Sequence, residues 1–303
     1  MCALLSGCTK SDDGRAVAGV AHKPIVALVM KSLANEFFTT MTEGARQHHA
    51  ASAATYDLIV NGIKNETDLA EQVTLVEQMI AQRVDAIVIA PADSKALVTV
   101  LKRARDAGIL VINIDNKLDD EVLKEAGLRV PFVGPDNRAG ARKVGETLAA
   151  HLHRGDKVAI IEGLPTAFNG QQRRLGFEDA MKAAGVDVVT TQSGRWEMDT
   201  ASNLAAAMIN EHADLKGILC ANDNMALGAV SAIQAAGRNG TILVAGFDNI
   251  SAVRPLLASG QVVATADQHG DRLAVFGIEA ALKILKGDAL PADQTTPVDL
   301  VIK

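Results

Sequence analysis

Short, almost wholly apolar runs recur along the chain from residue 24 onward, and longer amphipathic segments separate them. The runs are rich in valine and isoleucine and lack the polar–apolar alternation of a half-exposed strand, so they are typical of parallel strands buried on both faces. They predict ten strands: PIVALVM, YDLIV, DAIVIAP, ILVINID, PFVG, KVAIIEG, VDVVTT, GILCAND, TILVAGFD and VVATADQ.

The segments between these runs have the spacing of amphipathic helices. In residues 66–82, Leu69, Val73, Val76 and Ile80 recur at intervals of four, three and four and form one apolar face. Four further segments show the same pattern, and three of them end at a glycine suited to a helix C-terminus. Strand–helix repetition of this kind predicts an α/β fold with parallel, doubly wound sheets.

The length of the chain favours two such sheets. A chain of 303 residues can bury two cores, and ten strands divide better into two sheets than into one. An internal similarity supports the division, because DAIVIAPADSKALVTVLKRARDAG and KGILCANDNMALGAVSAIQAAG each read as a strand, a polar turn and an apolar-faced helix. We therefore expect two lobes of similar build.

Composition excludes several classes of function. Hydrophobic residues make up 48% and charged residues 22% of the chain, as in ordinary globular proteins. The net charge of −6 and the lack of a basic run argue against a nucleic-acid surface. No stretch reaches the ~18 apolar residues of a membrane span. Phosphate-loop, dinucleotide, HExxH and calcium-loop motifs are also missing from the sequence, which therefore predicts no enzyme, cofactor or metal.

The N-terminus carries a different signal. The tetrapeptide LSGC ends at Cys8, and a polar sequence of small residues follows it. This tetrapeptide resembles the lipobox of bacterial lipoproteins, in which the cysteine becomes the lipidated first residue. We expect residues 1–23 to be a lipoprotein-type signal remnant and tether, with lipidation at Cys8. Cys2 would be lost with the signal, and Cys220, in a predicted strand, would be a buried apolar residue outside any disulfide.

Polar and aromatic side chains gather where the predicted strands end, which is where open parallel sheets bind ligands. The first run is followed by Lys31, Asn35, Phe37 and Phe38, although the chain has only seven phenylalanines. The later strand ends and the loops after them supply carboxylates, amides, a guanidinium and the only tryptophan: Asp115, Asn116, Asn169, Arg173, Trp196, Asn222, Asp248 and Gln268.

This set of side chains suits an uncharged, polyhydroxylated ligand. Carboxylates and amides bind vicinal hydroxyls, arginine binds two oxygens at once, and aromatic faces cover the C–H faces of a sugar ring. Each residue also has a simpler interpretation, because a strand-end aspartate is often a helix cap and Phe37 or Phe38 alone is more often a core residue. The prediction of a sugar site depends on all of these side chains lying together at the carboxyl ends of the strands.

The chain resembles periplasmic sugar-binding proteins of the ribose-binding type, the receptors of bacterial ABC importers. The resemblance extends from about Pro24 to the C-terminus and is carried by ALVMKSLANEFF, DAIVIAPAD, VINIDN, RRLGF, ANDNMALGA, VAGFDN and ATADQ. It implies the type I periplasmic binding protein fold, with two Rossmann-like lobes joined by a three-crossing hinge that closes around a ligand. The N-terminal lobe would contain residues 24–133 and 269–297, and the C-terminal lobe residues 134–268 and 298–303.

The resemblance also implies that the strand-end residues named above contact the sugar, with Gln268 at a hinge crossing. Two positions depart from the ribose-type pattern. Asn116 stands where an arginine usually follows the aspartate, and Lys31 stands where a small residue is usual. Lys31 either supplies the missing positive group or points to solvent. D-ribose is the first expected ligand, and another pentose, a ketohexose such as fructose, or a sugar alcohol are the alternatives.

The same fold forms the effector domain of lactose-repressor-type transcription factors, but those carry a helix-turn-helix before the first strand. Only 23 residues precede Pro24, and they have the lipobox and tether. We therefore expect a periplasmic monomer that binds a monosaccharide and an ABC permease. A chemoreceptor is a compatible further partner. Membrane attachment is expected only through the lipid anchor, and no contact with nucleic acid is expected.

Overall fold

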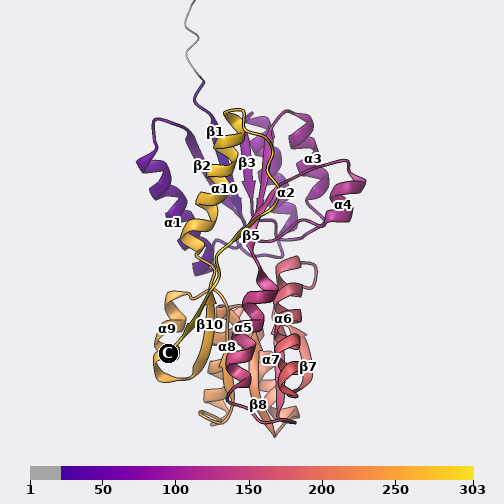
Figure 1. Ribbon diagram of the computed structural model, residues 1–303, viewed down its shortest axis with the longest axis vertical. Helices are drawn as coiled ribbons and strands as arrows, with labels where there is room; N and C mark the ends of the chain where they lie inside the picture. Colours follow the sequence, from indigo (N-terminus) through magenta and orange to yellow (C-terminus); the bar gives the residue numbers. More distant parts are fainter. Residues whose placement is uncertain (1–21) are drawn as a thin grey trace, which may run out of the picture.

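The computed structural model describes residues 22–303, which form two α/β lobes placed one above the other along the longest axis (Figure 1). The predicted lipidation site Cys8 lies outside the described residues, as does most of the predicted tether. The fold class expected from the sequence is confirmed, because each lobe has a six-stranded sheet with helices on both faces.

The sheet of the first lobe has the strand order β2-β1-β3-β4-β5-β11, and all of its pairings are parallel. Its strands are β1 (Ile25–Met30), β2 (Asp57–Gly62), β3 (Ala86–Ile89), β4 (Leu110–Ile114), β5 (Phe132–Pro135) and β11 (Gln294–Thr296). The strand order reverses between β1 and β3, which places a ligand-binding crevice at the carboxyl ends of these strands.

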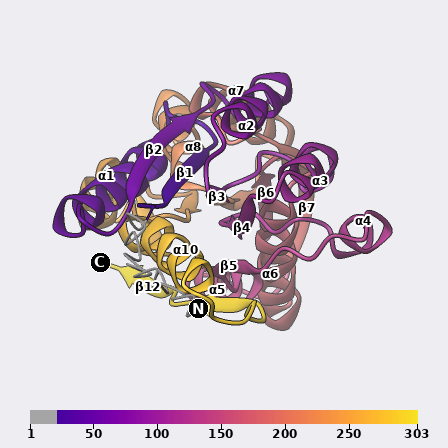
Figure 2. The ribbon, with the colours of Figure 1, turned by 90° about the horizontal axis from the view of Figure 1, so that it is seen from above.

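Alternate residues of β1 belong to two separate hydrophobic cores. Val26 and Leu28 pack with α1 and α10, while Ala27 and Val29 pack with α2, α3 and α4. Figure 2 shows α1 and α10 on one side of the sheet and α2 and α3 on the other. The bounds of these helices are α1 (Glu36–Ala51), α2 (Leu69–Ala81), α3 (Val98–Asp106), α4 (Asp120–Glu125) and α10 (Gly270–Leu285).

The second lobe repeats this arrangement with the strand order β7-β6-β8-β9-β10-β12, in which only the edge strand β12 is antiparallel. Its strands are β6 (Lys157–Glu162), β7 (Asp187–Ser193), β8 (Leu215–Cys220), β9 (Leu243–Ala245), β10 (Val262–Asp267) and β12 (Asp299–Ile302). Its helices are α5 (Asn137–Ala149), α6 (Phe168–Ala184), α7 (Met198–Glu211), α8 (Asp223–Ala235), the 3₁₀ helix η1 (Ser251–Val253) and α9 (Arg254–Ser259).

The chain passes between the two lobes three times, as Figure 1 shows near the middle of the molecule. The crossings lie between β5 and α5, between β10 and α10, and between β11 and β12. β5 ends at Pro135, so the first sheet extends two residues past the boundary proposed at residue 133. Because of these crossings, the carboxyl ends of the two parallel sheets face each other, and the loops after the strands meet between the lobes.

All ten predicted strands are present, and β11 and β12 are additional. The glycines predicted to end three helices are Gly185, Gly237 and Gly287, with φ of 70°, 64° and 106° respectively. That left-handed conformation favours glycine and explains its use at these positions. Among the described residues, no helix combines the length and apolar character needed to cross a bilayer.

Candidate functional site

A small cavity lies between the lobes, where the loops after the strands of both sheets meet. Eleven of the twelve residues predicted from the sequence line it, together with Glu66. The lining residues are Lys31, Asn35, Phe37, Phe38, Glu66, Asp115, Asn169, Arg173, Trp196, Asn222, Asp248 and Gln268.

The backbone around the cavity is held in uncommon conformations. Asp115, Trp196 and Asp248 line the cavity and have φ of 61°, 68° and 118°. Such conformations cost on the order of 1–3 kcal/mol in residues other than glycine and persist only where the surroundings fix them. Asn35 and Asn222 cap α1 and α8, since their side chains accept hydrogen bonds from the backbone two or three residues later. The helix-cap interpretation therefore holds for these two residues, and their side chains line the cavity as well.

Lys31 is buried between two carboxylates at the first-lobe wall. Its Nζ lies 3.1 Å from Glu66 Oε2 and 3.2 Å from Asp115 Oδ2, and the lysine is 1% exposed. Burial opposes the charged ammonium, but Asp115 and Glu66 together hold the pKa of Lys31 above its ordinary value. Burial raises the pKa of Glu66, although Lys31 opposes that shift. Of the two interpretations of Lys31, the structure excludes the solvent-directed one.

Arg173 is the buried cation at the second-lobe wall of the cavity, as Lys31 is at the first-lobe wall. Its Nε donates to Asn137 Oδ1 at 2.8 Å, and its Nη1 donates to the Ala221 carbonyl at 2.9 Å and to Asp248 Oδ1 at 3.2 Å. The guanidinium carbon lies 3.9 Å from the centre of the Phe247 ring. Burial raises the pKa of Asp248 well above its ordinary value, in opposition to Arg173. Four different groups therefore fix the orientation of this guanidinium.

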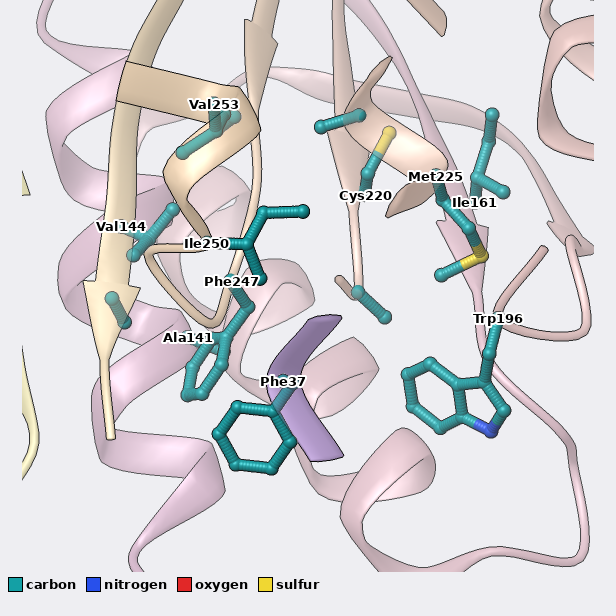
Figure 3. Close-up of a cluster of buried hydrophobic side chains, with 14 of the residues drawn as sticks. Phe37, Ala141, Val144, Ile161, Trp196, Cys220, Met225, Phe247, Ile250 and Val253 are labelled. Atoms are coloured by element: carbon teal, nitrogen blue, oxygen red, sulfur yellow. The ribbon is translucent and has the colours of Figure 1, made fainter. Parts of the chain in front are cut away.

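Aromatic side chains from both lobes close the cavity. Phe37 and Phe38 meet edge to face with ring centres 5.2 Å apart, and Lys31 Nζ lies 5.7 Å from the centres of both Phe38 and Trp196. Figure 3 draws Phe37 of the first lobe with Phe247 and Trp196 of the second, all in one hydrophobic cluster. These rings exclude water from the charged groups and strengthen their electrostatic interactions.

Two polar atoms of the cavity wall are buried and have no polar partner within the described part of the protein: the acceptor Gln268 Oε1 and the donor Trp196 Nε1. Two further buried acceptors, Glu66 Oε2 and Asp115 Oδ2, are paired with Lys31 Nζ at 3.1 and 3.2 Å, and each carboxylate can accept further hydrogen bonds. An unsatisfied buried polar group costs about 1–3 kcal/mol, so two of them beside two buried carboxylates indicate a ligand with matching groups. Three acceptors at one cavity fit a ligand that carries several hydroxyl donors.

Asn116 is the one predicted site residue that does not line the cavity. It is fully buried, and its Nδ2 donates to the Pro91 carbonyl at 2.9 Å while its Oδ1 accepts from the Asn169 backbone N–H at 3.1 Å. Its side chain therefore holds protein groups together. The buried positive charge beside Asp115 is that of Lys31, whose Nζ lies 3.2 Å from Asp115 Oδ2.

Glu66 is the lining residue that the sequence interpretation missed. It follows β2, but it opens the amphipathic segment 66–82 and so resembles the acidic first turn of a helix. In the structure α2 begins only at Leu69, and Glu66 is 6% exposed beside Lys31. The strand-end argument applied to β2 would have identified it. Residues 22–303 contain no cluster of three or more side chains suited to hold a metal ion.

Comparison with known proteins places this chain in a family. The family described as "Periplasmic binding protein domain" matches residues 26–289. The chain belongs to this family. Among curated members, the D-ribose/D-allose-binding protein of Pseudomonas aeruginosa is 56% identical over 288 residues, covering 94% of this chain and 90% of the relative.

Two crystal structures of periplasmic binding proteins are closely similar. An ABC transporter solute-binding protein from Burkholderia multivorans has a TM-score of 0.91 and 59% identity, covers 93% of this chain and 100% of its own, and holds an unknown ligand described as α-D-erythrofuranose. A periplasmic solute-binding protein from Actinobacillus succinogenes with bound D-allose has a TM-score of 0.86 and 36% identity, covering 92% of this chain and 98% of its own.

Proposed function

We propose that this protein is the solute receptor of an ABC sugar importer and that it binds one monosaccharide, D-ribose or D-allose, in the interlobe cavity. The observation that carries the proposal is the set of buried polar groups around one small cavity: Gln268 Oε1 and Trp196 Nε1 lack a partner among the described residues, and the Glu66 and Asp115 carboxylates can accept bonds beyond those to Lys31. A sugar supplies several hydroxyl groups within a few ångströms, each able to donate and to accept.

The choice of sugar follows from the cavity and from the relatives. The names of relatives combine D-ribose and D-allose, two aldoses with the same hydroxyl configuration at C2, C3 and C4. D-ribose stays the first expected ligand. Two aromatic walls, Phe37 and Phe38 from one lobe and Trp196 from the other, suit the C–H faces of a flat sugar ring. Another pentose, fructose or a sugar alcohol would fill the same space with a different hydroxyl pattern.

The twelve lining residues divide into three roles. Asp115, Glu66, Asp248 and the amides would bind hydroxyls, Arg173 and Lys31 would bind ring or hydroxyl oxygens, and the aromatic rings would cover the ring faces. Charge-assisted hydrogen bonds of ~1.5–3 kcal/mol each would dominate the selectivity. Closing the lobes would bury the sugar, and the closed protein would then dock on a membrane permease.

The setting of the receptor is part of the proposal. We propose a periplasmic location and a monomer, with membrane attachment through a lipid on Cys8 and with a chemoreceptor as a further partner. Membership of a binding-protein family and a cavity wall suited to hold a sugar between two lobes support a receptor and not an enzyme.

Calorimetric titration of the full chain tests the proposal. We expect heat of binding, at one site, with D-ribose and D-allose, and weaker or no binding with fructose, D-arabinose, ribitol and nucleosides. A thermal-shift series provides a second readout, because ligand at 100 times Kd stabilises the folded form by ~2.7 kcal/mol.

Asp115→Asn locates the binding site in the same assay. We expect a loss of about 10- to 100-fold in affinity for the sugar, from the loss of a charge-assisted bond. Asp106→Asn, at an exposed position of α3, is the matched control. Equal affinity in Asp115→Asn and wild type would place the sugar elsewhere, and no binding of any monosaccharide would refute the proposed function.

A further inference from the structure

Two groups of hydrogen bonds join the lobes outside the sugar cavity. The first, the Ser94 clasp, links the loops after β3 and β4 to the N-terminus of α6. Ser94 Oγ accepts from the Phe168 N–H at 2.9 Å, Asn116 Oδ1 accepts from the Asn169 N–H at 3.1 Å, and the Ser94 N–H donates to the Thr166 carbonyl at 3.2 Å. Of the five residues, only Asn169 lines the cavity, and it joins the clasp through its backbone N–H.

The Ser94 clasp supplies the side-chain cap that α6 lacks at its N-terminus. The N-cap residue of α6 is Ala167, which has no side-chain capping bond, so the N–H groups of Phe168 and Asn169 find no side-chain acceptor in their own lobe. Side chains of the first lobe cap this helix across the lobe boundary. The capping loop is itself held in place, because Asp93 accepts from two backbone N–H groups at 2.7 Å and Asn116 donates to the Pro91 carbonyl.

The second group, the Glu36 clasp, lies where α1 meets η1. Glu36 Oε1 accepts from the Ser251 N–H at 2.6 Å. The residue before this helical turn, Ile250, supplies no side-chain cap. As in the Ser94 clasp, a first-lobe side chain accepts from the backbone at the start of a second-lobe helical segment. Glu36 does not line the cavity.

We propose that the two clasps stabilise the closed form by an amount that does not depend on which sugar is bound, and that Ser94, Asn116 and Glu36 are therefore positioning residues for binding. This inference rests on the proposed function, in which a sugar binds between the closing lobes. Opening the lobes breaks every bond of both clasps, and none of the three side chains contributes to the cavity wall.

The clasps affect the observed affinity because sugar binding and lobe closure are coupled. The free energy of closure enters the observed affinity for every ligand equally, while contacts in the cavity differ between ligands. A net protein hydrogen bond corresponds to a factor of roughly two to ten in an equilibrium constant. Loss of one clasp should therefore weaken binding of D-ribose and D-allose by the same factor and leave the ratio of their affinities unchanged.

Ser94→Ala and Glu36→Ala in the full chain test the inference, singly and combined. Their matched controls are Ser259→Ala, whose hydroxyl bonds stay within α9 and the turn that follows it, and Glu43→Ala, whose partner Gln47 lies on the same helix. Affinities for D-ribose and D-allose come from calorimetry. Small-angle X-ray scattering without sugar gives the radius of gyration, which rises as the lobes open.

We expect each clasp variant to lose about two- to tenfold in affinity for both sugars and the double variant to show the product of the two losses, because the sites are distinct. A changed ribose-to-allose ratio, or affinities equal to wild type, would overturn the inference. If the wild type binds neither sugar, the proposed function fails. Scattering of the unliganded proteins then tests by itself whether the clasps hold the lobes closed. Larger radii of the unliganded variants would then support the clasps, and radii equal to wild type would overturn them.

Discussion

The indole of Trp196 packs directly against Gly163, and a Cβ placed on that glycine would lie 2.0 Å from Cζ2 of the indole. Gly163 follows β6, so the loop after one strand leaves room for the ring that the loop after β7 carries. Gly170 in α6 also faces this ring, since a Cβ placed there would lie 3.0 Å from the same Cζ2 atom. The two glycines set the position of the only tryptophan in the chain.

Gly163→Ala should displace the indole and weaken sugar binding by at least about tenfold, because a stacked aromatic contact is worth on the order of 1 kcal/mol and displaced atoms would also enter the cavity. Fluorescence of the single tryptophan during sugar titration measures the effect. The double variant with Trp196→Phe removes the clashing atoms and should recover melting temperature relative to Gly163→Ala. Equal melting temperatures of the single and double variants would contradict the steric explanation.

Lys31→Met should strongly destabilise the protein, by about 3–5 kcal/mol, because it leaves the buried Glu66 and Asp115 without their shared cation. Adding Glu66→Gln should restore part of that loss by removing one buried negative charge. Urea unfolding measures both changes. Lys95→Met removes an exposed ion pair with Asp119 and should change the free energy of unfolding by less than about 1 kcal/mol. A destabilisation by Lys31→Met no larger than this control would count against a buried ion cluster.

Arg173→Ala should reduce sugar affinity by roughly 2–4 kcal/mol, since it removes a sugar contact and leaves Asp248 and Asn137 without this partner. Arg174→Ala is the matched control, because the next residue on α6 pairs with Glu162 and Glu178 in its own lobe. Calorimetry with D-ribose compares the two variants. Similar affinities for both would exclude Arg173 from the binding site.

The melting temperature should rise as the pH falls from 7 to 5. Burial raises the pKa of Asp223 from 3.8 to about 6, against the bonds it accepts from Thr265 and the backbone. The folded form therefore binds this proton more tightly than the unfolded chain. The resulting stability is complete below pH 3.8 and is lost as the pH rises through 6, a difference of about 3 kcal/mol over the window.

Asp223→Asn isolates this contribution, because asparagine has a similar shape but does not titrate. Circular dichroism melts at pH 5, 6 and 7 should give a flatter pH dependence for this variant than for wild type or for the exposed control Asp106→Asn. Identical slopes would assign the pH dependence to other groups. Glu66 and Asp248, whose pKa values burial also raises, would retain a residual slope of the same sign.

The sequence predicted the buried strands well because their apolar runs carry the information locally. β11 was missed for the opposite reason, and β12 was missed although its sequence, DLVI, is largely apolar. β11 is the polar segment QTT, which becomes a strand only through pairing with β5 at the edge of the sheet, and β12 lies at the other sheet's edge with Leu300 and Ile302 exposed. β11 has no hydrophobic pattern of its own, so tertiary pairing decides its structure. β12 contains the apolar run LVI, so the sequence did carry a signal for this strand.

The residues that line the cavity were predictable as far as they follow the strand ends. Asn116 and Glu66 show the limit, because each depends on a neighbour that is distant in the sequence. Asn116 turns away from the cavity to the N-terminus of α6, and Glu66 turns into it because Lys31 lies there. A single sequence reveals the residue type at a strand end but not the direction of its side chain when two partners compete for it.

The three crossings of the chain also determine when each lobe can be completed during synthesis. α10 packs on β1, β3, β4 and β5, yet it is made only after the whole of the second lobe's parallel sheet. Until residue 285 has emerged, the face of the first sheet that carries Val26 and Leu28 lacks one of the helices that shield it. The nascent chain therefore exposes an apolar surface for most of its synthesis, which favours a holding chaperone and late, cooperative folding of both lobes.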